Sequence, residues 1–276
     1  MPGRGGRSDE QLQRAVFALN NRRPDEAERI ARETLRANPN HPVALQVLGR
    51  SLLVQGRNHD AVTLLEPAAR SRHDPEIETQ LAIGLRKLGR RDEALARLKR
   101  ATKRPPAYVP ALRELGSLLY EMTRYDEAIA VLRGAVDAAP MMPDLWIQLG
   151  FACMQRKNHD DAKSAFARAL QIAPGVPDAL FGMARLHMGL REYEPAVACY
   201  RQYLMSKPEN SEAWLSLGHC LLELGQLESG YECFRAAARG DARRAGVALA
   251  SLVKSGRGRF WLRPSAAARF LLQAKR

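Results

Sequence analysis

The sequence has few aromatic residues, only four cysteines and no long apolar segment. Aromatic residues make up 6% of its 276 residues, and Ala, Leu and Arg dominate instead. This composition favours helices, because strands are rich in the β-branched and aromatic side chains that are scarce here. No apolar run approaches the roughly 18 residues of a membrane span, and the polar N-terminus lacks the apolar core of a secretory signal. We therefore expect a soluble, cytoplasmic, helical protein.

The sequence also lacks the residue patterns of catalytic and metal sites. It contains no H-E-x-x-H, G-x-S-x-G or P-loop pattern, and none of its cysteines belongs to a C-x-x-C pair. Widely separated cysteines in an unsecreted protein are expected to be reduced core residues. These are Cys153, Cys199, Cys220 and Cys233. We predict neither an enzyme nor a cofactor or metal site.

The net charge of +13 is distributed unevenly along the chain. Residues 109–240 hold 13 Lys or Arg and 16 Asp or Glu, whereas residues 241–276 hold nine and one. A strongly basic chain can indicate nucleic-acid binding. The distribution weakens that interpretation for the centre of the chain and confines it mainly to the C-terminal segment.

A repeat of about 34 residues organises most of the chain. One column of small residues recurs at a near-constant interval, with only one of its six gaps differing from the rest: Ala27, Ala61, Ala94, Ala128, Ala162, Ala196 and Gly230. A second small-residue column, from Ala15 to Gly218, precedes it at a constant offset, and a third column, mostly proline, follows it. Such a period indicates stacked copies of one supersecondary unit.

Each unit has the apolar pattern of two amphipathic helices. In the fifth unit, apolar or small residues recur at helical spacing first over 146–153 and then over 162–169. Acidic residues precede Ala162, where they favour the positive end of the second helix, and Pro174 ends the unit. We expect Gly150 and Ala162 to lie where two helix backbones approach closely.

These columns resemble the tetratricopeptide repeat family, whose pattern is W-x2-L-G-x2-Y, then A-x3-F, then P. The fifth unit matches it at Trp146, Leu149, Gly150, Ala162, Phe166 and Pro174, with Cys153 in place of tyrosine. The seventh matches it at Trp214, Leu217, Gly218 and Phe234. The resemblance implies an all-α, right-handed solenoid with a concave groove lined by the first helix of each unit. We expect disorder over residues 1–7, seven repeats over 8–244 and capping helices over 241–276.

The repeat register predicts which first-helix side chains face this groove. The predicted groove residues are Arg50, Arg86, Arg113, Ile147, Phe151, Met154, Phe181, Arg185 and Met188. The arginines make the N-terminal half basic, although Glu76 and Glu121 temper it, and the C-terminal half is apolar. Methionines beside aromatic rings suit an adaptable binding groove. The same side chains could instead pack on each other, and the pattern leaves both interpretations open.

The C-terminal segment carries a basic, aromatic patch consisting of Arg257, Arg259, Trp261 and Arg263. It could stack on bases and pair with phosphates, or link the array to a further domain. We favour a third interpretation, in which residues 241–254 and the apolar residues around Trp261 cover the open end of the last repeat.

Two functions follow from the sequence. The first is a non-catalytic scaffold or assembly factor that binds a partner's peptide or helix, with an acidic and an apolar part, along the groove. The alternative is an adaptor that binds nucleic acid or an anionic surface through the basic tail.

Overall fold

The computed structural model describes residues 4–71, 74–103, 106, 108–239, 246–248 and 250. The chain divides into two compact units, residues 1–140 (unit 1) and 141–276 (unit 2). The helices of unit 1 are α1 (Arg4–Asn20), α2 (Pro24–Ala37), α3 (Pro42–Val54), α4 (Asn58–Ser71), α5 (Pro75–Lys87), α6 (Arg91–Ala101), α7 (Val109–Glu121) and α8 (Tyr125–Ala138). Those of unit 2 are α9 (Pro143–Gln155), α10 (His159–Ile172), α11 (Pro177–Gly189), α12 (Tyr193–Ser206), α13 (Ser211–Glu223) and α14 (Leu227–Ala238).

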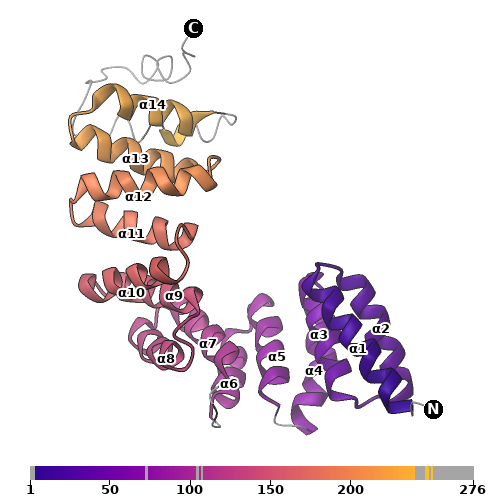
Figure 1. Ribbon diagram of the computed structural model, residues 1–276. Helices are drawn as coiled ribbons and strands as arrows, with labels where there is room; N and C mark the ends of the chain where they lie inside the picture. Colours follow the sequence, from indigo (N-terminus) through magenta and orange to yellow (C-terminus); the bar gives the residue numbers. More distant parts are fainter. Residues whose placement is uncertain are drawn as a thin grey trace. The chain divides into compact units, whose positions relative to one another are not determined.

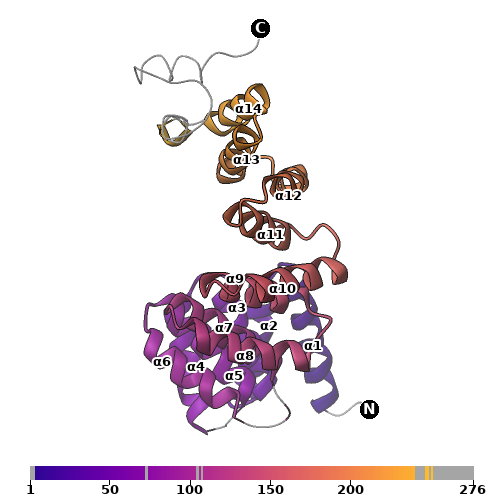
Figure 2. The same cartoon turned by 90° about the vertical axis from the view of Figure 1, so that its left-hand side faces the viewer.

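Consecutive helices pack as antiparallel pairs, from α1 with α2 to α13 with α14 (Figure 1). Within unit 2, α11 to α14 follow one another in a stack that two perpendicular views show (Figures 1 and 2). No residue in the described part of the chain is in a strand. The described residues therefore form tandem helical hairpins, as the repeat predicts.

The turn inside every hairpin has the same geometry. The second residue after the first helix has a positive φ in each pair: Arg22, Gly56, Gly89, Thr123, Lys157, Arg191 and Gly225. The amide that follows donates to the carbonyl five residues before it, as Arg124 does to Leu119 at 2.9 Å. This is a Schellman motif, which ends a helix by satisfying its last carbonyl groups.

The first helices of the pairs begin with proline or a capping side chain. Pro42, Pro75, Pro143 and Pro177 occupy the first helical position, where their missing N–H costs nothing. Asn210 caps α13 by accepting a hydrogen bond from the amide of Ala213 at 2.9 Å. These residues account for the starts of α3, α5, α9, α11 and α13.

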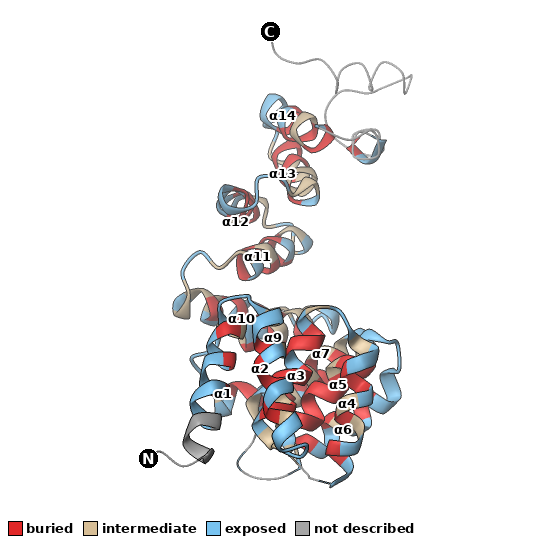
Figure 3. Cartoon of the chain, turned by 90° about the vertical axis from the view of Figure 1, so that its right-hand side faces the viewer, coloured by how far each residue is buried: buried red, intermediate tan, exposed pale blue. Residues whose placement is uncertain are grey.

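The repeating small residues lie in the core, as predicted. The column from Ala27 to Ala196 has no exposed surface, and the buried faces of the helices point toward one another (Figure 3). The largest fully buried side chains include Phe166, Tyr200 and Phe234. Within each unit, neighbouring hairpins share apolar core clusters, such as the one that joins residues of α11, α12 and α13.

The reason for a small residue in the fifth unit differs from the predicted one. A Cβ on Gly150 would lie 2.7 Å from Cε1 of Phe166, and a Cβ on Gly182 would also overlap that ring. The two glycines make room for an aromatic side chain rather than for a second backbone. In the seventh unit the backbones do approach, because a Cβ on Gly218 would lie 3.1 Å from the carbonyl oxygen of Gly230.

The N-terminal helix begins before the predicted boundary. Residues 4–7, which the sequence led us to expect as disordered, lie in α1. Pro2 is the last residue before them that would stop a helix, because glycine weakens a helix without ending it.

Candidate binding surfaces

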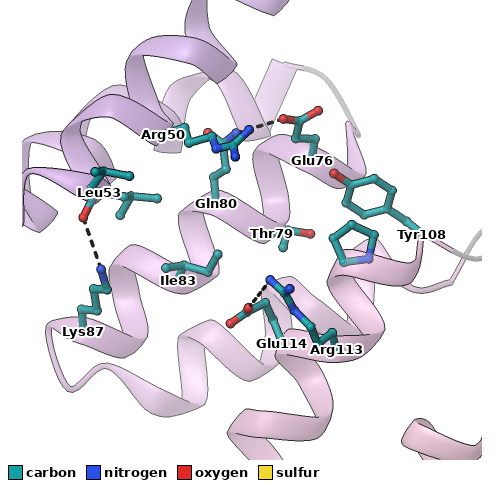
Figure 4. A pocket seen from close by; sticks show the side chains of 12 residues that line it. Arg50, Leu53, Glu76, Thr79, Gln80, Ile83, Lys87, Tyr108, Arg113 and Glu114 are labelled. Atoms are coloured by element: carbon teal, nitrogen blue, oxygen red, sulfur yellow. Dashed lines mark hydrogen bonds and ion pairs between the residues drawn. The ribbon is translucent and has the colours of Figure 1, made fainter. Parts of the chain in front are cut away.

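The first helices of unit 1 form one surface, which we call the A-helix face and which comprises α1, α3, α5 and α7. Successive members of this set contact each other directly. A pocket of about 380 Å³ lies between α3, α5 and α7 (Figure 4). It is lined by Arg50, Leu53, Val54, Glu76, Thr79, Gln80, Ile83, Lys87, Tyr108, Pro110, Arg113 and Glu114.

The three predicted arginines of this face differ in their partners. Arg86 forms ion pairs with Glu114 at 3.2 Å and Glu121 at 3.6 Å, and Arg113 bonds to Glu114 at 3.1 Å. Arg50 is exposed, and its guanidinium has no hydrogen bond or ion pair to any described residue. The geometry thus leaves Arg50 as the predicted arginine whose charge a partner can meet without breaking an existing pair.

Acidic and phenolic groups on the rim of the pocket moderate its charge. Burial raises the pKa of the Glu76 carboxyl, and the nearby Asp74 raises it further, whereas the positive charge of Arg50 acts in the opposite direction. Burial also raises the pKa of Tyr108 to about 12, so its hydroxyl stays protonated near neutral pH. With Arg50, Lys87 and Arg113 as cations and Glu76 and Glu114 as anions, the lining has a formal net charge of +1.

Exposed valines flank Arg50 along α3. Val43 is 40% exposed and Val54 is 61% exposed, and the spacing of seven and four residues places both near Arg50 on one side of the helix. Val43 also lines a second pocket, of about 330 Å³, with Leu12 and Val16 of α1. The A-helix face therefore presents a cation between two apolar patches.

The predicted apolar residues of α9 are only partly accessible. Ile147 is 6% exposed and offers little surface. Phe151 is half-buried, and its ring packs edge-on against Phe166 with centroids 5.1 Å apart. Met154 is half-buried.

The predicted residues of α11 also pack against their neighbours. The ring of Phe181 lies 5.0 Å from that of Tyr203, centroid to centroid, and the guanidinium of Arg185 lies 5.8 Å from the Phe181 centroid. Met188 accepts a hydrogen bond from the Tyr200 hydroxyl at 3.9 Å. In both α9 and α11, self-packing accounts for much of the apolar pattern.

The predicted basic tail residues, Arg257, Arg259, Trp261 and Arg263, lie outside the described residues. Ala248, in the segment expected to begin the cap, is described. It is fully buried and packs in a cluster with Leu222, Tyr231 and Phe234.

The sequence prediction missed Glu114, Val43 and Val54. The pattern that could have revealed the valines is their seven- and four-residue spacing from Arg50, which places all three on one side of the helix. No sequence signal distinguishes Glu114 as the partner of arginines on two helices.

The fold defines a class: a tandem array of helical hairpins. None of the helices in the described ranges is both long and apolar enough to cross a bilayer. Two tetratricopeptide repeat family models match the chain, one over residues 79–143, 113–177 and 181–246 and the other over 18–83 and 153–207. The chain belongs to the tetratricopeptide repeat family.

Solved structures agree with this assignment at the level of the fold. PilF of Pseudomonas aeruginosa is 22% identical with a TM-score of 0.65, over 74% of this chain and 95% of that one. PilW, a type IV pilus biogenesis factor, is 19% identical with a TM-score of 0.67, over 75% and 96%. A tetratricopeptide repeat protein of Parabacteroides merdae is 16% identical with a TM-score of 0.60, over 96% and 99%. No curated protein matches the sequence.

Proposed function

We propose that the chain is a non-catalytic scaffold that binds a peptide or helix of a partner protein on the A-helix face of unit 1. The observation that carries this proposal is the exposed guanidinium of Arg50, which has no partner in the described part of the chain and lies between the exposed side chains of Val43 and Val54. An acidic side chain of a partner would pair with Arg50, and flanking apolar side chains would bury the valines. The partner segment therefore has both acidic and apolar parts.

A helix suits this surface because the three contact positions follow helical spacing. At a rise of about 1.5 Å per residue, Val43 and Val54 lie about 16 Å apart along α3. An amphipathic helix packed beside α3 would place apolar residues at both ends of that span and an acid between them.

The pair Arg50→Glu and Arg91→Glu tests the proposal. Both positions are exposed and both substitutions change the net charge equally, but Arg91 begins α6 and lies outside the pocket lining. Affinity capture with quantitative mass spectrometry should recover the same partner with the wild type and with Arg91→Glu. Arg50→Glu should reduce its recovery, and titration of the purified partner should show a loss of about tenfold, or 1.4 kcal/mol.

Equal recovery with the two variants would refute the proposal. Variants of Phe151 and Phe181 are less informative here, because both rings pack against buried aromatic residues and a charge there would disturb the core. Circular dichroism of each variant separates lost binding from lost folding.

We also propose that seven repeats extend over residues 8–244 and that residues 241–276 cap this array. The contact of Ala248 with the cluster on α13 and α14 supports this, because the last hairpin of an array has an apolar face that needs a cover. Deletion of residues 256–276 should lower the melting temperature. Unchanged stability together with a loss of salt-sensitive nucleic-acid binding would instead favour the basic tail as a binding element.

A further inference from the structure

A second groove lies on unit 2, between the second helices α12 and α14, with α13 as its floor. Its volume is about 510 Å³. It is lined by Arg201, Leu204, Met205, Trp214, Leu217, Leu221, Ser229, Glu232, Cys233, Ala236 and Arg239. None of these residues belongs to the A-helix face, so the groove is independent of the proposed function.

The sequence of α14 explains why there is space on this side. Ala236 and Ser229 line the groove, whereas the equivalent positions one repeat earlier, on α12, hold the larger Gln202 and Pro195. The last hairpin therefore places smaller side chains along the groove than the hairpin before it has at the same positions.

The groove has an apolar floor and an exposed apolar edge. Leu217 and Leu221 are buried at its base, and Met205 is 84% exposed, the highest value among the exposed large apolar residues of the described chain. Trp214 is half-buried, and its indole Nε1 donates a hydrogen bond to the carbonyl of Pro208 at 2.8 Å, which fixes the ring. A flexible methionine beside a fixed indole forms a surface that can pack against an apolar partner side chain.

The charged groups of the groove are predominantly basic. Arg201 and Arg239 are exposed, and neither guanidinium group has a hydrogen bond or ion pair to a described residue. Glu232 is the single acid among the lining residues. Burial raises the pKa of the Cys233 thiol to about 12, so the thiol is protonated near neutral pH and contributes packing rather than reactivity.

We propose that this groove binds an acidic, apolar segment of a partner protein. Apolar side chains of the segment pack on Met205 and Trp214, and its carboxylates pair with Arg201 and Arg239. The chain's own C-terminal residues 251–276 have the same positive charge as the groove, because they contain seven Lys or Arg and no acid. Charge complementarity thus selects a partner segment over the tail.

Fluorescence anisotropy with the full chain and three labelled peptides of equal length tests this proposal. One peptide contains Glu, Leu and Phe, the second replaces every Glu by Lys, and the third replaces the apolar residues by Ser. The peptide with Glu, Leu and Phe should bind most tightly. Its affinity should fall as the salt concentration rises, because its carboxylates pair with exposed arginines. Equal affinity of the Glu and Lys peptides would overturn the proposal.

Variants then locate the site. Ala236→Gln introduces the side chain that the preceding repeat has at this position, and Arg201→Glu/Arg239→Glu reverses the charge of the rim. Each variant should lower the affinity for the Glu–Leu–Phe peptide by about tenfold or more. Arg191→Glu, an exposed position on the turn before α12, should leave the affinity unchanged. Loss of binding in Arg50→Glu but not in the groove variants would assign the peptide to the A-helix face and overturn the proposal.

Two further measurements test the other possible occupants of the groove, which are the chain's own C-terminal segment and a second copy of the chain. Deletion of residues 256–276 should leave the peptide's affinity unchanged, and an increase of more than about tenfold would show that the tail occupies the groove. In analytical ultracentrifugation, Met205→Glu should leave the oligomeric state of the chain unchanged. Self-association that Met205→Glu abolishes would show that a second copy of the chain occupies the groove and would overturn the proposal.

Discussion

The contact between Phe166 and two glycines leads to a prediction in which one substitution has different effects at two places on the same helix. Gly182 and Gly189 both lie in α11. A Cβ on Gly182 would overlap the ring of the fully buried Phe166, whereas a Cβ on Gly189 would meet no atom within 4 Å. Replacing each with alanine therefore adds the same methyl group to a filled and to an open position.

The magnitude follows from two terms. Alanine in a helix is more favourable than glycine by about 0.8–1 kcal/mol, and this term acts at both positions, although less at a helix end. Overpacking a buried site costs about 1–3 kcal/mol. The ring cannot move away easily, because it also lies close to the backbone of Gly150, where an added Cβ would be only 2.7 Å from its Cε1. We expect Gly182→Ala to be less stable than Gly189→Ala by about 1–3 kcal/mol.

Urea unfolding followed by circular dichroism measures this difference, and hydrogen exchange of the amides in α10 and α11 confirms that the change is local. Because repeat arrays can unfold in steps, the midpoints of the two variants are compared under identical conditions. In a Phe166→Leu background, Gly182→Ala should destabilise the protein less than it does with Phe166 present. The change in stability caused by Gly189→Ala should be the same in both backgrounds. Equal stability of the two alanine variants would refute the steric argument.

Three other predictions concern unit 1. Thr123 is β-branched and has φ of 59°, and the equivalent residue one repeat earlier is Gly89, with φ of 80°. Because a β-branched residue is strained at positive φ, Thr123→Gly should raise the unfolding free energy by about 1 kcal/mol and Gly89→Thr should lower it by a similar amount. Urea midpoints that do not move in opposite directions would contradict this. Glu78 is 2% exposed and pairs with Arg100 at 3.0 Å, so Glu78→Gln should cost about 2 kcal/mol in the same assay, and a loss below about 0.5 kcal/mol would argue against the pair. The pKa of Glu76 is raised in the folded state, so its contribution to stability is complete below the ordinary value of 4.5 and declines as pH rises through the folded value. The melting temperature of Glu76→Gln should therefore match the wild type in acid and exceed it at neutral pH, and a constant difference across pH would exclude burial of this carboxyl as the cause.

The repeat itself could be predicted from the sequence because it depends on local chemistry repeated seven times. Small residues at a constant spacing, prolines between units and apolar residues at helical spacing each specify a helix, a boundary or a buried face. The turn geometry follows the same period, even where Arg22 or Thr123 replaces glycine. The register of the array imposes a left-handed backbone there that the residue type alone would not predict.

The accessibility of the predicted binding residues could not be derived in the same way. A period places Ile147, Phe151 and Phe181 on one side of their helices, but the side chains of neighbouring helices decide how much of each remains exposed. Likewise, Arg50 and Arg86 were both predicted from the repeat register to face the groove. Only the packing of α5 beside α7 brings Glu114 to Arg86, whereas the guanidinium of Arg50 has no such partner among the described residues.

The amino-acid sequence by itself therefore determined the all-helical class, the repeat and its family, because these depend on residue types at fixed spacing. The tertiary structure decided which charges are satisfied, why Gly150 must be small, and that a groove opens between α12 and α14. Those features arise where side chains from separate helices meet. The distances between such side chains depend on how whole helices pack together, which residue spacing along one helix does not specify.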